Sequence, residues 1–136
     1  CETPPAARIL DGGNTLVAAA FGDAAKIAAL RAAGGEVVML PNENGKVDLP
    51  HLMRLLAGRG VNELHVEAGH KLNGSLLREG LVDELLLYFA PTILGSGREM
   101  FPLPEIADLA GRRDLKILDL RRVGGDIRIL ARLLPA

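Results

Sequence analysis

The sequence predicts an α/β protein with a mainly parallel sheet, flanked by helices and completed by an antiparallel C-terminal hairpin. Two observations lead to this fold class. Short apolar runs typical of buried strands alternate with stretches of helical periodicity, and strands separated by helices usually pair in parallel. In the tail, two strand-like runs over residues 115–123 and 127–133 are separated by little more than Gly124-Gly125, a dipeptide typical of a two-residue hairpin turn.

The first part of the chain contains a strand, a helix and a second strand. Residues 15–20 form a short apolar run, and Asp23 stands where it can cap a helix over residues 24–33. Gly34-Gly35 then supplies a helix stop that tolerates positive φ. The run from Glu36 to Leu40 predicts the next strand.

A second helix follows a turn at residues 41–45. Asp48 and Pro50 are typical of a helix start, and Gly58 and Gly60 end the apolar pattern. The apolar positions recur at the i, i+3, i+4, i+7 spacing of one helical face, at Leu49, Leu52, Met53 and Leu56. This is the clearest amphipathic helix in the sequence.

The second half predicts a strand over residues 64–67, a helix from about Asn73 to Glu79 and a strand over residues 84–90. These strands are expected to extend the parallel sheet. In the last run, apolar residues alternate with Arg128 and Arg132, which predicts one buried and one solvated face.

Composition excludes several classes of partner. The chain of 136 residues is 49% hydrophobic and fits one domain, here a single partial domain over residues 1–136. A net charge of −1 and an aromatic content of 3% provide neither a positive field nor stacking surfaces for nucleic acid. No polybasic cluster or long apolar run predicts membrane binding, and we expect a cytoplasmic protein.

Cys1 is the single cysteine, so neither a disulfide framework nor a thiolate metal site is predicted. The three histidines, His51, His65 and His70, do not share a helical face, and no metal is expected. Residues 1–14 are predicted to be extended or linker-like. Since the chain starts at Cys1 rather than methionine, we interpret it as a piece of something longer.

The most informative run extends from Val66 to Leu77. It predicts a strand that ends in a carboxylate, Glu67, then a glycine-rich turn and a helix. Backbone N–H groups at such a helix start can bind an anion, although many such turns serve only to reverse the chain. Lys71 can approach a phosphate or act as a solubilising surface group. The spacing of Gly69 and Gly74 matches neither a dinucleotide fingerprint nor a phosphate loop.

Glu67 allows two interpretations. A carboxylate at the end of a central strand is well placed for a ligand, because ligands in open α/β sheets bind at the carboxyl ends of strands. It can equally accept hydrogen bonds from neighbouring loop N–H groups. His70 has the best claim of the histidines to a functional role, because it shares the turn.

Three motifs together resemble a known family. They are the run from Val66 to Leu77, the run Gly80-Leu81-Val82-Asp83-Glu84-Leu85 and the run Ala90-Pro91-Thr92-Ile93-Leu94-Gly95. In this order and spacing they resemble the C-terminal reductase domain of the bifunctional riboflavin-biosynthesis deaminase–reductase (RibD). The resemblance covers most of the chain and is strongest over residues 64–97.

This resemblance implies a fold like that of dihydrofolate reductase and the activity of a 5-amino-6-(5-phosphoribosylamino)uracil reductase. That family reduces a ribosylamino-pyrimidine phosphate to its ribitylamino form with NADPH as hydride donor, and its members usually form homodimers. The glutamate of the motif, here Glu67, contacts substrate in the family. The segment that lines the cofactor corresponds to Gly69, His70, Lys71, Leu72, Asn73, Gly74 and Ser75.

Some family features are missing from the sequence. Complete domains begin with a Ser-Leu-Asp-Gly stretch and a Gly-Thr turn, and neither is found, nor is the zinc deaminase motif Pro-Cys-x-x-Cys. Ala68 replaces a glycine common in the motif. We therefore expect the distal portion of a reductase domain, inactive by itself because hydride transfer needs both walls of its pocket.

Two other functions remain open. One is a catalytically inert nucleotide-binding or dimerisation fragment, which the missing upstream motifs and the apolar run over residues 84–90 favour. The other is a general pteridine or folate reductase, which the Glu-x-Gly and Val-Asp-Glu-Leu patterns disfavour. NADPH is expected from the family, while no residue of the sequence is identifiable as a 2′-phosphate contact that would separate NADPH from NADH.

Overall fold

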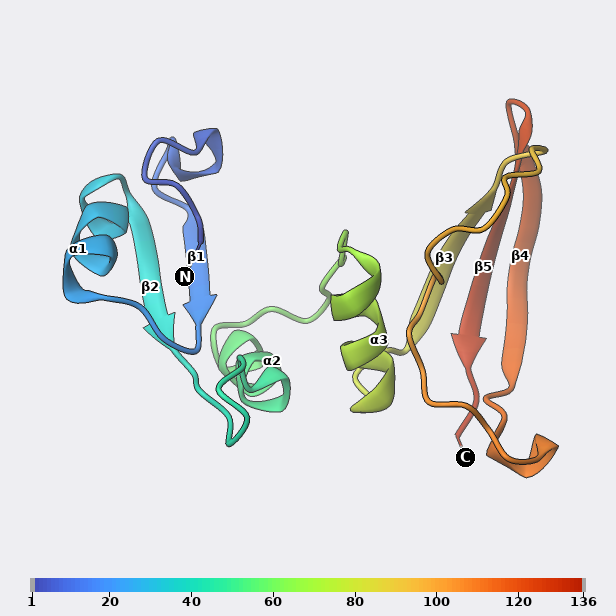
Figure 1. Ribbon diagram of the computed structural model, residues 1–136. Coiled ribbons are helices and arrows are strands. Elements are labelled where there is room, and N and C mark those ends of the chain that lie inside the picture. The colour runs from blue at the N-terminus through green and yellow to red at the C-terminus, as the bar shows by residue number, and fades with distance from the viewer. Residues whose placement is uncertain (1, 136) are drawn as a thin grey trace. The chain divides into compact units, whose positions relative to one another are not determined.

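A strand–helix–strand arrangement forms first along the chain. In the computed structural model, which describes residues 2–135, β1 (Thr15–Ala19) and β2 (Gly35–Met39) pair in parallel, with Val17 opposite Val37. The connecting helix α1 (Ala24–Ala32) lies beside this strand pair (Figure 1). A parallel pair requires such a crossover, because the chain must return to the same end of the sheet before the second strand begins. The predicted strands, helix and parallel pairing are confirmed.

Aspartate side chains cap the first two helices as predicted. Asp23 Oδ1 accepts a hydrogen bond from the Lys26 N–H at 2.7 Å. In α2 (Leu49–Gly58), Asp48 Oδ1 accepts from the His51 N–H at 2.8 Å. Each cap satisfies one of the N–H groups that a helix start leaves without an intrahelical acceptor.

A small apolar core holds this arrangement together. Leu10, Leu30 and Val37 are buried, with Leu10 only 1% and Leu30 0% exposed, and Val17 and Ile27 pack against them. Leu10 ends a 3-10 turn, η1 (Arg8–Leu10). The expectation of an extended or linker-like start is therefore wrong for these residues, because burying Leu10 fixes this part of the chain. Cys1 lies outside the described residues.

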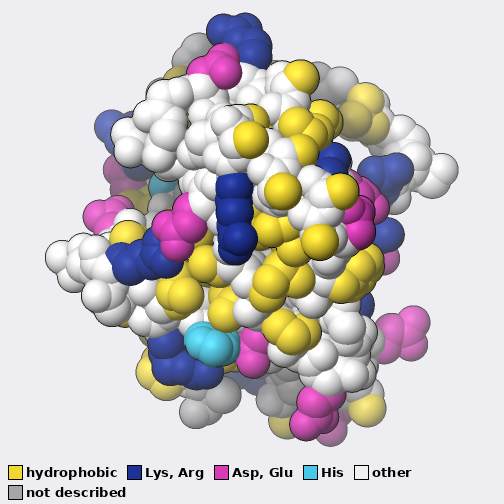
Figure 2. Space-filling view, turned by 90° about the vertical axis from the view of Figure 1, so that its left-hand side faces the viewer, with side chains coloured by type: hydrophobic (Ala, Val, Ile, Leu, Met, Phe, Trp, Pro, Cys, Tyr) yellow, Lys and Arg dark blue, Asp and Glu magenta, His cyan; other side chains and the backbone are white. Residues whose placement is uncertain are grey.

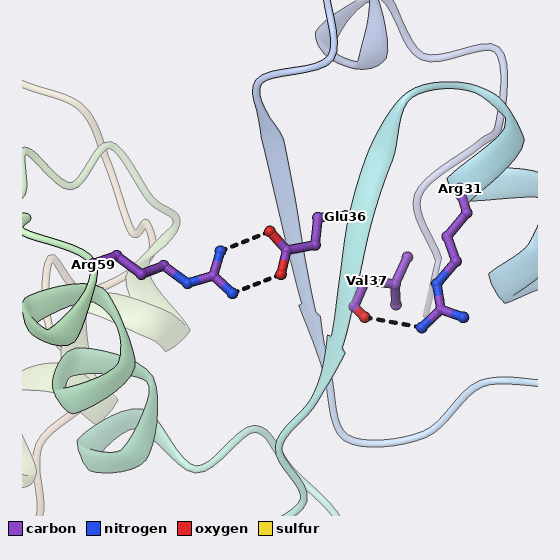
Figure 3. Close-up of polar contacts among 4 residues, drawn as sticks. All are labelled: Arg31, Glu36, Val37 and Arg59. Carbon is purple, nitrogen blue, oxygen red and sulfur yellow. Dashed lines mark hydrogen bonds and ion pairs between the residues drawn. The ribbon is translucent and has the colours of Figure 1, made fainter.

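An ion pair connects β2 to the residue that ends α2. Both guanidinium Nη atoms of Arg59 donate to the two carboxylate oxygens of Glu36 at 2.6 Å (Figure 3). Arg31 at the end of α1 donates to the Val37 carbonyl of the same strand at 3.3 Å. The hydrogen bond from Arg59 lowers the pKa of Glu36 and, reciprocally, raises the pKa of Arg59.

The Glu36–Arg59 pair predicts a small pH-dependent contribution to stability. Because the folded-state pKa of Glu36 is lowered, its stabilisation is present at neutral pH and is lost as the pH falls through that pKa. We expect Glu36→Gln to lower Tm slightly at pH 7, by little because both side chains are exposed. Thermal unfolding at several pH values should show this difference shrinking below about pH 4.3, the unperturbed glutamate pKa.

Glu43→Gln is the control, since the Glu43 side chain is exposed and lies in a turn. A Tm difference for Glu36→Gln that stayed constant from pH 7 to pH 3 would contradict the assignment.

The chain divides between His65 and Val66 into two compact units. We call them the N-terminal unit (residues 2–65) and the C-terminal unit (residues 66–135). The C-terminal unit contains one α-helix, one 3-10 turn and three strands, which are α3 (His70–Arg78), β3 (Glu84–Phe89), η2 (Leu109–Gly111), β4 (Leu115–Val123) and β5 (Asp126–Leu133).

The three strands form an antiparallel sheet in the order β3-β5-β4 (Figure 1). The predicted hairpin between β4 and β5 is confirmed, with Val123 opposite Asp126 and Gly124 at φ +61°. The expectation that residues 84–90 join a parallel sheet is wrong, because β3 pairs antiparallel with β5. The α/β class is correct, but the parallel pairing in residues 2–135 is confined to β1 and β2.

The predicted strand over residues 64–67 is also wrong, since these residues have no regular secondary structure. Leu64 and Val66 are exposed despite their apolar side chains. A strand exists only when a neighbouring strand accepts and donates its backbone hydrogen bonds, and among the described residues no strand pairs with this segment.

One face of the C-terminal sheet is apolar. Residues directly opposite one another share a face, and the register places apolar side chains of all three strands together, among them Leu85, Leu87, Ile117, Leu120, Ile129 and Ala131. We call this set the apolar sheet face. Ala131 is buried as predicted, but Ile117 and Leu120 on the outer strand β4 are 58% and 59% exposed. On the opposite face, Arg128 is largely covered rather than solvated, and its Nη2 lies 3.5 Å from Asp119 Oδ2.

Candidate functional site

The run that the sequence singled out forms the start of α3. Glu67 lies in the irregular segment before the helix, Gly69 is the N-cap with an extended backbone, and His70 is the first helical residue. The predicted helix start near Asn73 is therefore three residues too late. The expected glycine-rich turn is therefore largely helical, with Gly69 before the helix and Gly74 within it.

Backbone donors converge at this helix start. The N–H groups of Leu72 and Asn73 donate to the Gly69 carbonyl at 3.1 and 3.2 Å. Helix geometry leaves the preceding N–H groups, of Gly69, His70 and Lys71, without an intrahelical acceptor, and the N-cap has no side chain to take one. No acidic residue lies in the first turn, and Lys71 adds a positive charge to the positive end of the helix dipole. The arrangement suits an anionic ligand.

Asn73 fixes the segment that carries Glu67. Its Nδ2 donates to the Ala68 carbonyl at 3.2 Å, which ties the residue after Glu67 back to the second turn of the helix. The Glu67 side chain is exposed. The structure thus places the predicted substrate residue next to the predicted cofactor residues, because they are continuous in the chain and cross-linked by this hydrogen bond.

Gly74 has a packing role that its place in the run did not indicate. The residue is buried, and a Cβ at this position would lie 2.7 Å from Pro102 Cδ and 2.8 Å from Pro102 Cγ. Only glycine lets the proline ring approach this close to the helix backbone. Gly74 therefore faces the long connection between β3 and β4.

Arg78 is a residue that the sequence did not single out. Its Nη1 donates to the Pro102 carbonyl at 2.6 Å and its Nη2 donates to Ser75 Oγ at 2.9 Å. Ser75 Oγ in turn donates to the Lys71 carbonyl at 3.1 Å. The contact between Arg78 and Ser75 could be expected from the sequence, because residues three apart are neighbours on a helix surface. Nothing in the sequence indicates Pro102, which is 24 residues further along the chain.

The three histidines belong to two different units. His51 and His65 belong to the N-terminal unit, whereas His70 belongs to the C-terminal unit. Within residues 2–135, the structure contains no group of three or more His, Cys, Asp or Glu that could hold a metal ion. Among the same residues, no helix is long and apolar enough to cross a membrane.

Charges of both signs are interspersed with hydrophobic side chains on the face shown in Figure 2.

Two hollows in the described surface are lined by residues outside α3. One is lined by the end of β1 and by Gly45, Lys46 and Val47 in the N-terminal unit. The other is lined by residues 103–106 and 111–113 in the C-terminal unit. Neither is lined by residues 67–75. At the start of α3, Glu67, Gly69 and Lys71 are exposed, whereas His70 is half-buried.

The fold and this site define an α/β protein in which a glycine-initiated helix presents backbone donors and a lysine beside an exposed glutamate. The sequence matches the family described as the RibD C-terminal domain over residues 1–129. The chain belongs to that family.

Individual relatives agree with the family. The riboflavin biosynthesis protein RibD of Escherichia coli (strain K12) is 42% identical over 91 residues, which are 66% of this chain and 25% of that protein. A 2,5-diamino-6-ribosylamino-4(3H)-pyrimidinone 5′-phosphate reductase of Archaeoglobus fulgidus is 34% identical over 137 residues, covering 97% of this chain and 58% of that protein. The solved structure of Acinetobacter baumannii RibD (form 1) superposes with a TM-score of 0.79 at 26% identity, covering 98% of this chain and 35% of that one.

The chain therefore spans about a quarter of the E. coli relative and a little over half of the archaeal one. The family membership predicted from the three sequence motifs is confirmed.

Proposed function

We propose that this chain is the distal portion of a reductase domain of riboflavin biosynthesis. With its remaining segments, the domain reduces 5-amino-6-(5-phosphoribosylamino)uracil to the ribitylamino product. The observation that carries the proposal is the start of α3 in a chain of this family, where N–H groups without an intrahelical acceptor and Lys71 follow Glu67 in the chain. The name of the archaeal relative, a reductase of a ribosylamino-pyrimidine phosphate, supports the substrate class.

NADPH is the proposed cofactor, and it supplies the hydride when bound. The N–H groups of Gly69, His70 and Lys71 suit its phosphates, because they are donors at the positive end of a helix. Ser75 and Asn73 act within this site by holding the Lys71 and Ala68 carbonyls. Glu67 is proposed to accept hydrogen bonds from substrate hydroxyls. Leu72, which is partly exposed, and the buried Gly74 complete the cofactor segment.

Further parts of the proposal concern the whole protein. A fold like that of dihydrofolate reductase, organisation as one partial domain, assembly as a homodimer and a cytoplasmic setting are properties that the family resemblance and composition predict. The exposed Ile117 and Leu120 of the apolar sheet face support assembly, because an exposed apolar patch usually marks an interface.

The expected result for the site concerns Glu67. In the intact reductase that contains this chain, Glu67→Gln should lower kcat/KM for the pyrimidine substrate about 10–100-fold, since a hydrogen bond to a charged group contributes about 1.5–3 kcal/mol. NADPH oxidation followed by absorbance measures it.

The matched control is Glu63→Gln, four residues upstream and equally exposed, which should leave turnover unchanged. Unchanged turnover in Glu67→Gln would remove Glu67 from the site.

A second candidate function is an inert nucleotide-binding or dimerisation fragment. The exposed apolar residues of the apolar sheet face favour it. Titration of this chain with NADPH, together with sedimentation at several protein concentrations, separates the candidates. Saturable binding supports the reductase proposal. A concentration-dependent dimer that binds no NADPH supports the dimerisation fragment.

A further inference from the structure

A hydrogen-bonded chain runs from the first turn of α3 to the long connection between β3 and β4. It begins at the Lys71 carbonyl, which accepts from Ser75 Oγ at 3.1 Å. Ser75 Oγ accepts from Arg78 Nη2 at 2.9 Å, and Arg78 Nη1 donates to the Pro102 carbonyl at 2.6 Å. One guanidinium group therefore joins a helix hydroxyl to a loop carbonyl, a pairing that the fixed fork of arginine donors favours.

Apolar packing reinforces this connection. The Pro102 ring lies directly against the backbone of Gly74, one residue before Ser75. Phe101 and Pro102 are half-buried, whereas Ile93 and Leu94 earlier in the same connection are 100% and 82% exposed. The connection between β3 and β4 contains no strand and one short 3-10 turn, η2. Long connections of this kind in compact proteins are usually functional, and this one is fastened to the helix at Pro102.

We propose that Arg78 is a positioning residue for cofactor binding. It fastens the Phe101–Pro102 part of the loop to α3 through the Pro102 carbonyl. It also orients the Ser75 hydroxyl so that Oγ donates a hydrogen bond to the Lys71 carbonyl. This inference rests on the proposed function of the α3 start as the NADPH phosphate site. Arg78 lies in the last turn of α3, at the opposite end of the helix from the Gly69 N-cap. It acts through Ser75 and the loop and sets the affinity for NADPH without contacting it.

The test combines two measurements on the full chain. Hydrogen exchange without cofactor, followed by mass spectrometry over residues 99–104, reports whether the loop is fastened. NADPH titration reports whether fastening affects the site. We expect Arg78→Ala to speed exchange in this segment several-fold and to weaken NADPH binding about tenfold, equivalent to about 1.4 kcal/mol. Arg78→Lys should recover part of both, because a lysine ammonium can reach one of the two acceptors.

Arg54→Ala is the matched control. Arg54 is an exposed arginine on α2 whose removal changes the net charge equally, so exchange over residues 99–104 and NADPH affinity should both stay unchanged. The Tm of Arg78→Ala should match that of Arg54→Ala, because Arg78 is itself exposed. A weakened Kd at unchanged Tm separates positioning from general loss of structure.

The outcomes are distinguishable. Unchanged exchange in Arg78→Ala overturns the fastening of the loop. Faster exchange with unchanged NADPH affinity overturns the positioning role and leaves the proposed function standing. If the unsubstituted chain binds no NADPH, the proposed function of the helix start fails, and the cofactor role of Arg78 fails with it.

Discussion

Leu30→Ala is expected to destabilise the protein by about 2–5 kcal/mol, the range for truncating a fully buried leucine. Leu30 is 0% exposed and packs with Leu10 and Val37 in the small core of the N-terminal unit. A core with so few fully buried side chains has little surrounding apolar volume to fill the cavity. Urea unfolding followed by circular dichroism measures the change in free energy of unfolding.

Ile9→Ala is the matched control for this change. Ile9 lies beside Leu10 in the same 3-10 turn, but its side chain is 69% exposed. Its truncation removes a similar apolar side chain from solvent rather than from the core, so the free energy of unfolding should change little. Equal losses in the two variants would show that Leu30 is not a core residue.

Gly74→Ala is expected to destabilise the C-terminal unit by about 1–3 kcal/mol, the usual cost of forcing extra volume into a packed site. The sign is opposite to the general rule, because glycine within a helix normally costs about 1 kcal/mol relative to alanine. The new Cβ would lie 2.7 Å from Pro102 Cδ, and a proline ring cannot rotate away. Thermal or urea unfolding measures the loss.

Gly58→Ala supplies the contrast. Gly58 is the last residue of α2, its φ is not positive, and a Cβ there would meet nothing within 4 Å. This substitution should raise stability by up to about 1 kcal/mol. A similar gain in Gly74→Ala would mean that Pro102 does not pack against α3.

The features that the sequence predicted correctly depend on residues close together in the chain. The caps at Asp23 and Asp48 involve atoms three residues apart, and the turn at Gly124 involves adjacent residues. Such features depend on short stretches of sequence, so they follow from residue type and spacing. The family motifs are also local runs, which is why the family could be recognised before the fold was known.

The features that the sequence did not predict depend on contacts between residues far apart in the chain. β3 has the apolar composition of a buried parallel strand, but its partner β5 lies about forty residues later and runs antiparallel. The run over residues 64–67 has strand-like residues without a strand partner among the described residues. In both cases the apolar pattern identified which residues favour a strand and left the pairing undetermined.

The same division applies to the candidate site. The sequence by itself determined that the run from Glu67 to Ser75 belongs to a RibD C-terminal domain, and the substrate and cofactor roles of these residues stay predictions. Only the tertiary structure decided that the helix begins at His70, that Gly74 packs against Pro102, and that Arg78 joins Ser75 to the loop. The physical reason is that helix signals act within a few residues, whereas the approach of Pro102 depends on the path of the whole connection between β3 and β4.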